Sequence, residues 1–81
     1  MSERLPIVSR DRVISALKKF NYQVISQKGS HVKLTLILKD RKHSIVIPRH
    51  RELDRGTLMS IIKKVSEFID KEEFIKEIKG S

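Results

Sequence analysis

Apolar side chains recur every three or four positions near the start of the chain, at Val13, Ala16, Leu17 and Phe20. This spacing places them on one face of a helix. Ser9 precedes the run as a candidate N-cap, and Asn21 follows it as a residue that tolerates the left-handed backbone at helix ends. The pattern predicts a helix over residues 10–20.

From Tyr22 the period changes to two, which is typical of strands. In the first run, Tyr22, Val24 and Ser26 alternate with Gln23, Ile25 and Gln27, up to Gly29-Ser30. In the second run, Val32, Leu34, Leu36 and Leu38 share one face, and His31, Lys33, Thr35 and Ile37 share the other. A charged turn over 39–42 leads to a third run over 43–47, which Pro48 ends because proline cannot donate to a strand ladder. We expect an antiparallel meander with His31 on its polar face.

A helical period returns after the meander. Asp54 is the candidate N-cap of a helix whose apolar stripe consists of Leu58, Ile61, Ile62 and Val65. Asp70 and Glu73 have capping-box spacing, which predicts a further short helix over 70–79. We expect residues 1–8 to form a flexible leader. The predicted fold is α+β in the order α-β-β-β-α, with a three-stranded antiparallel sheet, helices on one face and a short C-terminal helix.

The length of the chain limits what kind of site it can form. It has 81 residues, and a domain of this size buries only about 60% of its unfolded surface. We therefore expect one domain over residues 1–81, with a thin core and any chemistry on an open face.

Positive charge is concentrated in the first part of the chain. Residues 1–51 hold 12 lysines and arginines against 3 acids, whereas residues 52–81 hold 6 against 7, which together give +8. The basic part also carries all three histidines. Such a concentration of positive charge is typical of a surface that binds nucleic acid.

Several classes of site and location are disfavoured. The chain has no cysteine, which excludes disulfides and agrees with a reducing cytoplasm. We find no signal peptide and no apolar run of the roughly 18 residues that a membrane helix needs. The three histidines are 12 and 7 positions apart, which matches no familiar metal-ligand pattern. We expect a cytoplasmic protein without a membrane segment, metal or small-molecule cofactor.

Several short motifs occur in a fixed order along the chain: Leu5-Pro6, Val8-Ser9, the helix around Val13–Lys19, Gln27-Lys28-Gly29-Ser30-His31, Ile47-Pro48-Arg49-His50 with Arg51, and Gly56-Thr57-Leu58. Together they resemble the HicA family of toxins over roughly residues 5–75. The resemblance implies a fold like the double-stranded RNA-binding domain and cleavage of mRNA. It also implies inhibition by a HicB-like antitoxin that covers the basic face, with His31 as the catalytic histidine.

His31 is suited to the chemistry that the resemblance implies. Histidine moves protons near neutral pH, and RNA carries its own nucleophile in the 2′-hydroxyl. We expect His31 to transfer a proton as general acid or base, and DNA to remain uncut. Lys28 and Lys33 would hold the phosphate, Gly29 would allow close approach, and Ser30 would offer its hydroxyl or N–H to a phosphate oxygen. The alternative for His31 is a histidine at the edge of an ordinary hairpin turn that makes one local hydrogen bond. The alternative for Lys28 and Lys33 is that they are solvated lysines without a specific role.

The remaining basic positions carry weaker predictions. Arg49, His50 and Arg51 form a basic loop that we expect to bind RNA, although a partner protein or solvent are alternatives. His43 begins a strand and is interpreted as structural. Two other functions stay open for the whole chain: a non-catalytic double-stranded RNA-binding module, which has no need of His31, and a protein-interaction module.

Overall fold

Residues 8–48 and 51–80 are described in the structure, a computed structural model. The elements in chain order are β1 (Val8–Ser9), α1 (Arg10–Lys19), β2 (Tyr22–Lys28), β3 (His31–Ile37), β4 (Lys42–Pro48), β5 (Glu52–Leu53), α2 (Arg55–Val65) and α3 (Lys71–Ile78). Strands β2, β3 and β4 form a three-stranded antiparallel sheet in that order. The predicted α+β class, the meander and the short C-terminal helix are confirmed.

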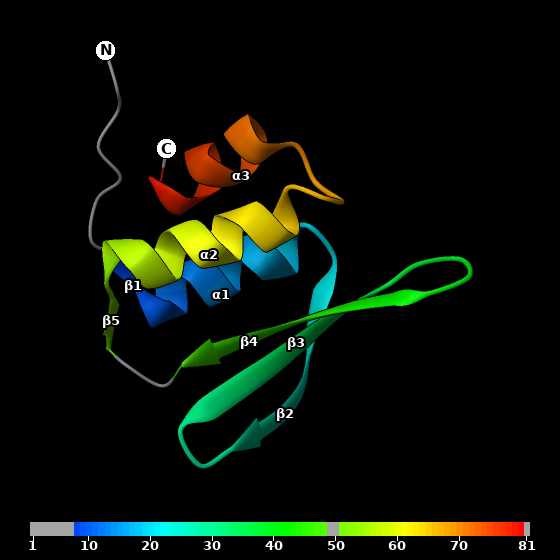
Figure 1. Cartoon of the computed structure of the whole chain (residues 1–81), viewed down its shortest axis with the longest axis horizontal. Helices are drawn as coiled ribbons and strands as arrows, with labels where there is room; N and C mark the ends of the chain where they lie inside the picture. The colour runs from blue at the N-terminus through cyan, green and yellow to red at the C-terminus, as the bar shows by residue number, and fades with distance from the viewer. Residues whose placement is uncertain (1–7, 49–50, 81) are drawn as a thin grey trace.

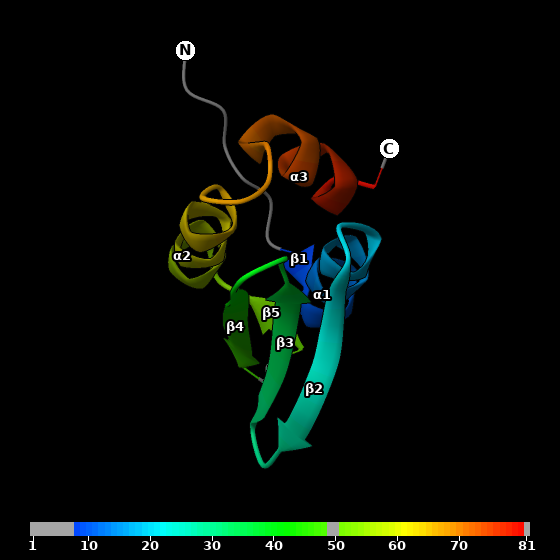
Figure 2. The same cartoon turned by 90° about the vertical axis from the view of Figure 1, so that its right-hand side faces the viewer.

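The elements are stacked in three layers. Helices α1 and α2 lie side by side on one face of the sheet, and α3 packs over them on the side away from the strands (Figures 1 and 2). The buried cluster draws on all three layers, for example through Leu34 of β3, Leu17 of α1 and Phe74 of α3, each 0% exposed. We call the covered face of the sheet the inner face and the opposite one the outer face. The β2–β3 hairpin extends beyond the helices (Figure 1).

Side chains cap each of the three helices at its N-terminus. Ser9, Asp54 and Asp70 accept hydrogen bonds from the backbone N–H groups of Arg12, Thr57 and Glu73. Each bond satisfies one of the donors that a helix start leaves unpaired. Asn21, directly after α1, has a φ of 76°. The predicted helix starts are thereby confirmed, and α1 ends one residue before the predicted position, at Lys19.

A second, very small sheet joins the start of the described chain to the segment before α2. Val8 pairs with Leu53, and Ser9 pairs with Glu52. Both apolar partners are buried, at 5% and 1% exposed. The predicted leader is therefore wrong at Val8, and its residues 1–7 lie outside the described chain. Strands of two residues are too short to show an alternating pattern, which explains why the sequence did not indicate them.

A β-bulge interrupts β2 and changes which side chains reach the outer face. Tyr22 pairs with Leu36 on the inner face, but the register shifts between Val24 and Ser26. Beyond the shift, Ser26 pairs with Lys33 and Lys28 pairs with His31. Directly opposed residues share a face. The prediction of unbroken alternation is wrong here, because one extra residue reverses the facing of every later side chain.

Candidate active site

The turn between β2 and β3 builds the site. Gly29 has a φ of 54°, a left-handed value that residues with a Cβ rarely adopt. Ser30 is not among the residues with positive φ, so the pair matches a type II′ turn with glycine at its first central position. A Cβ built on Gly29 would meet nothing within 4 Å. Backbone conformation therefore explains the glycine, and the space above it is open to a ligand.

His31 is exposed at the first position of β3, directly after this turn. Its Nδ1 atom lies 3.1 Å from the Ser30 hydroxyl oxygen, within hydrogen-bond distance. This contact occupies one ring nitrogen, and within residues 8–48 and 51–80 Nε2 has no hydrogen-bond partner. The prediction that His31 lies on the polar face and outside the core is confirmed.

Two exposed lysines flank His31 on the outer face. Lys28 is directly opposite His31 on β2, and Lys33 is two residues further along β3. Opposed residues are about 5 Å apart and alternate residues of a strand about 7 Å apart. The structure thus brings together the predicted residues Lys28, Gly29, Ser30, His31 and Lys33.

The basic loop begins beside the same site. Pro48, the last residue of β4, pairs with His31 on the other side from Lys28. Pro48 is the predicted end of the third strand and part of the Ile47-Pro48-Arg49-His50 motif, but no signal in the sequence shows that it neighbours His31. Arg49 and His50 lie outside the described residues. Arg51 is exposed, and its carbonyl accepts a hydrogen bond of 3.0 Å from the Arg10 N–H near the small sheet.

His43 has a structural environment at the other end of the sheet, on the inner face opposite Leu36. Its Nδ1 is 2.8 Å from the Tyr22 hydroxyl, and its ring centroid is 4.3 Å from that of Phe68. Burial, with a smaller contribution from Lys64, lowers the pKa of His43 below 6.5 against the opposing effect of Glu67. Burial, together with Glu67, raises the pKa of Tyr22 to about 12, which keeps its hydroxyl protonated. These contacts agree with the structural interpretation.

We expect the free energy of unfolding to decrease as the pH falls below the ordinary histidine pKa of 6.5. The unfolded chain then binds a proton at residue 43 while the folded protein does not, and the loss stops once the pH is below the lowered pKa. Urea unfolding at about pH 7.5 and about pH 5.5 measures this difference. The His43→Gln variant should show a smaller difference, and an equal one would contradict the role of this side chain.

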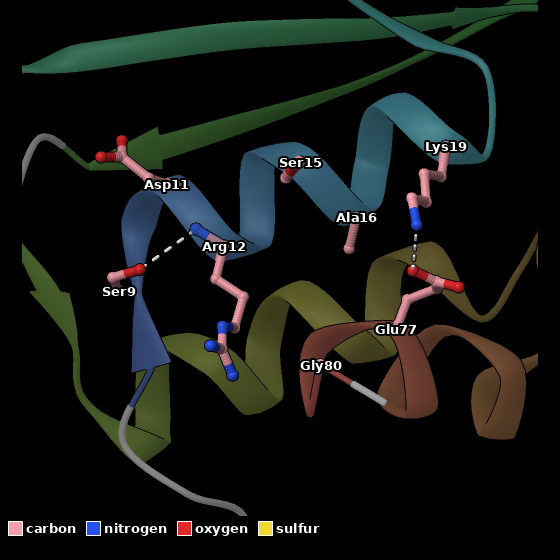
Figure 3. Close-up of a pocket in the computed structure, with 8 residues that line it drawn as sticks. All are labelled: Ser9, Asp11, Arg12, Ser15, Ala16, Lys19, Glu77 and Gly80. Atoms are coloured by element: carbon pink, nitrogen blue, oxygen red, sulfur yellow. Dashed lines mark hydrogen bonds and ion pairs between the residues drawn. The ribbon is translucent and has the colours of Figure 1, made fainter.

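A hollow of about 470 Å³ lies between α1 and α3, and none of the predicted site residues lines it (Figure 3). Arg12 Nη1 donates to the carbonyls of Ile78 and Lys79 at 3.4 Å each, and Lys19 Nζ is 3.2 Å from a Glu77 carboxylate oxygen. A cation at the C-terminus of a helix interacts favourably with its dipole. The Arg12 and Lys19 contacts at the edge of this hollow link α1 to α3.

Two further properties concern the described ranges as a whole. Within residues 8–48 and 51–80, no three His, Cys, Asp or Glu side chains are grouped as ligands for a metal ion. None of the helices in these ranges has the length and apolarity needed to cross a membrane.

The geometry describes a small basic α+β protein that presents one histidine between two lysines on an open sheet face. A sequence model of the HicA toxin of bacterial toxin–antitoxin systems matches residues 10–66, which include His31. The chain belongs to this family and is a toxin of a toxin–antitoxin system, which implies an antitoxin partner. No curated protein and no solved structure matched the chain. Helix α3 lies beyond the matched residues.

Proposed function

We propose that this toxin is an endoribonuclease that cuts mRNA in the cytoplasm without a metal ion, using His31 for proton transfer. The observation that carries the proposal is the exposed imidazole between Lys28 and Lys33, with Nδ1 at hydrogen-bond distance from Ser30. A basic, open face suits a long anionic substrate better than it suits a small molecule, which would need an enclosed pocket.

The proposed reaction is an internal transesterification of RNA. The 2′-oxygen forms a bond to the adjacent phosphorus, and the bond from phosphorus to the 5′-oxygen breaks. The 2′-hydroxyl loses a proton and the leaving 5′-oxygen gains one, so the products carry a 2′,3′-cyclic phosphate and a 5′-hydroxyl. His31 Nε2 serves one of these two proton transfers, with solvent serving the other. A positioned acid or base contributes about 10²–10⁴-fold to such a step.

The neighbouring groups would hold the phosphate. Negative charge develops on its oxygens in the transition state, and the ammonium groups of Lys28 and Lys33 would stabilise it. The open space above Gly29 would let the RNA backbone approach the turn. The Ser30 hydroxyl would orient the imidazole, and the backbone N–H of Ser30 would donate a hydrogen bond to a phosphate oxygen. We assign Arg49, His50 and Arg51 to contacts with the phosphates that follow along the strand.

Analysis of the product ends tests the proposal. The purified protein should cut single-stranded RNA in EDTA and leave a 2′,3′-cyclic phosphate on one product and a 5′-hydroxyl on the other. A matched oligonucleotide with one 2′-deoxy residue at the cleavage position should stay intact there, because it lacks the nucleophile. Products with a 5′-phosphate, or cleavage at the deoxy position, would contradict the mechanism. Tight binding of duplex RNA without any cleavage would favour the non-catalytic module instead.

A further inference from the structure

Helix α2 has a solvent-facing surface that its role in the core does not explain. Its inner stripe of Leu58, Ile61, Ile62 and Val65 is buried. On the opposite side, Gly56, Ser60 and Lys63 follow one another at helical spacing, with Met59 beside them. These residues and Lys71 of α3 border a shallow hollow of about 600 Å³. We call this hollow the α2 groove. Its residues belong to α2 and α3, the helices on the covered side of the sheet (Figures 1 and 2), whereas His31 is exposed on the outer face of β3.

The α2 groove exposes apolar surface that no contact among the described residues explains. Met59 is 54% exposed, although the large apolar residues of the neighbouring turns are buried. Gly56 is also unexplained by packing, since an added Cβ would meet only an Asp54 carboxylate oxygen, at the ordinary contact distance of 3.5 Å. Gly56 is the second residue of α2, and its φ is not positive, so no turn requires glycine there. The missing side chain keeps the groove open.

The charged side chains that line the groove are basic, and the nearby Asp54 carboxylate is used to cap α2. Helix α2 contains no acidic residue, and both charged residues that border the groove are lysines, Lys63 and Lys71. The ligand that complements this surface has an apolar side chain flanked by carboxylates. RNA phosphates would pair with the lysines but would leave Met59 in water, so an acidic amphipathic protein segment fits better.

We infer that the α2 groove is a docking site for the antitoxin, separate from the face that carries His31. An apolar side chain of the antitoxin would lie on Met59 between Gly56 and Ser60, and acidic side chains would pair with Lys63 and Lys71. This inference rests on the proposed function only in placing RNA at His31. Gly56 and Ser60 also line a neighbouring hollow with Val46 and Pro48 of β4, whereas Met59, Lys63 and Lys71 line the α2 groove alone. Contacts at these last three residues would hold the antitoxin away from His31.

Binding measurements with one variant that adds a charge and one that reverses a charge test the inference. The tagged His31→Ala toxin is expressed from its own operon together with the antitoxin. The antitoxin that co-purifies is separated in denaturant and refolded. The Kd of the toxin–antitoxin complex is then measured by calorimetry. In this background, Met59→Lys and Lys63→Glu should each raise the Kd about tenfold or more. The matched control is Lys18→Glu, which also reverses an exposed lysine in the last turn of a helix, here α1. It should change the Kd less than about twofold.

Three results separate the possible outcomes. With His31 intact, the Met59→Lys toxin alone should cut RNA at the parent rate and melt at the parent temperature. Unchanged Kd values for Met59→Lys and Lys63→Glu would overturn the inference. Weaker RNA binding with unchanged antitoxin binding would also overturn it and assign the groove to nucleic acid. If the parent toxin failed to cut RNA, the nuclease proposal would be contradicted, but the measured effects of the groove variants on antitoxin binding would remain valid.

Discussion

Replacing His31 with alanine is expected to lower the rate of RNA cleavage by about 10²–10⁴-fold, the contribution of one positioned acid or base. The melting temperature should not change, because the imidazole is exposed on the outer face and, among the described residues, its side-chain hydrogen bond is to its neighbour Ser30. Single-turnover cleavage of a labelled RNA and thermal unfolding followed by circular dichroism measure the two quantities separately.

Two companion variants show whether the effect belongs to proton transfer. Ser30→Ala keeps the imidazole but removes its hydrogen-bond partner, so we expect a smaller loss of about two- to tenfold, equivalent to one bond of roughly 0.5–1.5 kcal/mol. Gln23→Ala changes an exposed residue near the far end of β2 and should leave the rate unchanged. If the His31→Ala variant retained more than about one tenth of the parent rate, His31 would not be the residue that transfers the proton.

Replacing Phe74 with alanine is expected to lower the free energy of unfolding by about 3–5 kcal/mol, as for other buried aromatic residues. The ring is 0% exposed, and its centroid lies 6.0 Å from that of Phe20 in an edge-to-face arrangement. Native proteins have about 0.05–0.15 kcal/mol of stability per residue, so this one side chain accounts for a large part of the total. Urea unfolding followed by circular dichroism gives the difference.

The Phe74 result also tests whether α3 is part of the fold, although it lies beyond the residues that match the family. Ile75→Ala changes the adjacent, partly buried residue of the same helix and should cost clearly less than Phe74→Ala. Equal and small losses for both variants would mean that α3 does not contribute to the core. Cleavage per folded molecule should be unchanged in both, because α3 packs over α1 and α2 on the covered side of the sheet (Figure 2), whereas His31 is exposed on the outer face of β3.

Local patterns were sufficient to predict most of the fold. The caps Ser9, Asp54 and Asp70 could be predicted because a capping side chain bonds to a backbone N–H only three residues away. The facing of β3 followed from unbroken alternation, so the exposed position of His31 could also be predicted. In each case the relevant interaction lies within one turn of helix or one short strand. It can therefore be predicted from residues that are close together in the sequence.

Contacts between distant residues could not be predicted in this way. Val8 and Leu53 pair across most of the chain, and neither two-residue strand has a pattern of its own. The bulge in β2 is the most consequential example, since strict alternation from Tyr22 would place Lys28 on the inner face. The register with β3 instead puts Lys28 opposite His31.

The amino-acid order alone was enough to establish the succession of helices and strands, the basic character of the first part of the chain and the solvent-facing position of His31. Three-dimensional packing was needed to bring Lys28 and Pro48 to either side of that histidine and to leave the α2 groove uncovered. The reason is physical: hydrogen-bonded caps and alternation act over a few residues, whereas strand register and uncovered surface depend on which distant segments come into contact.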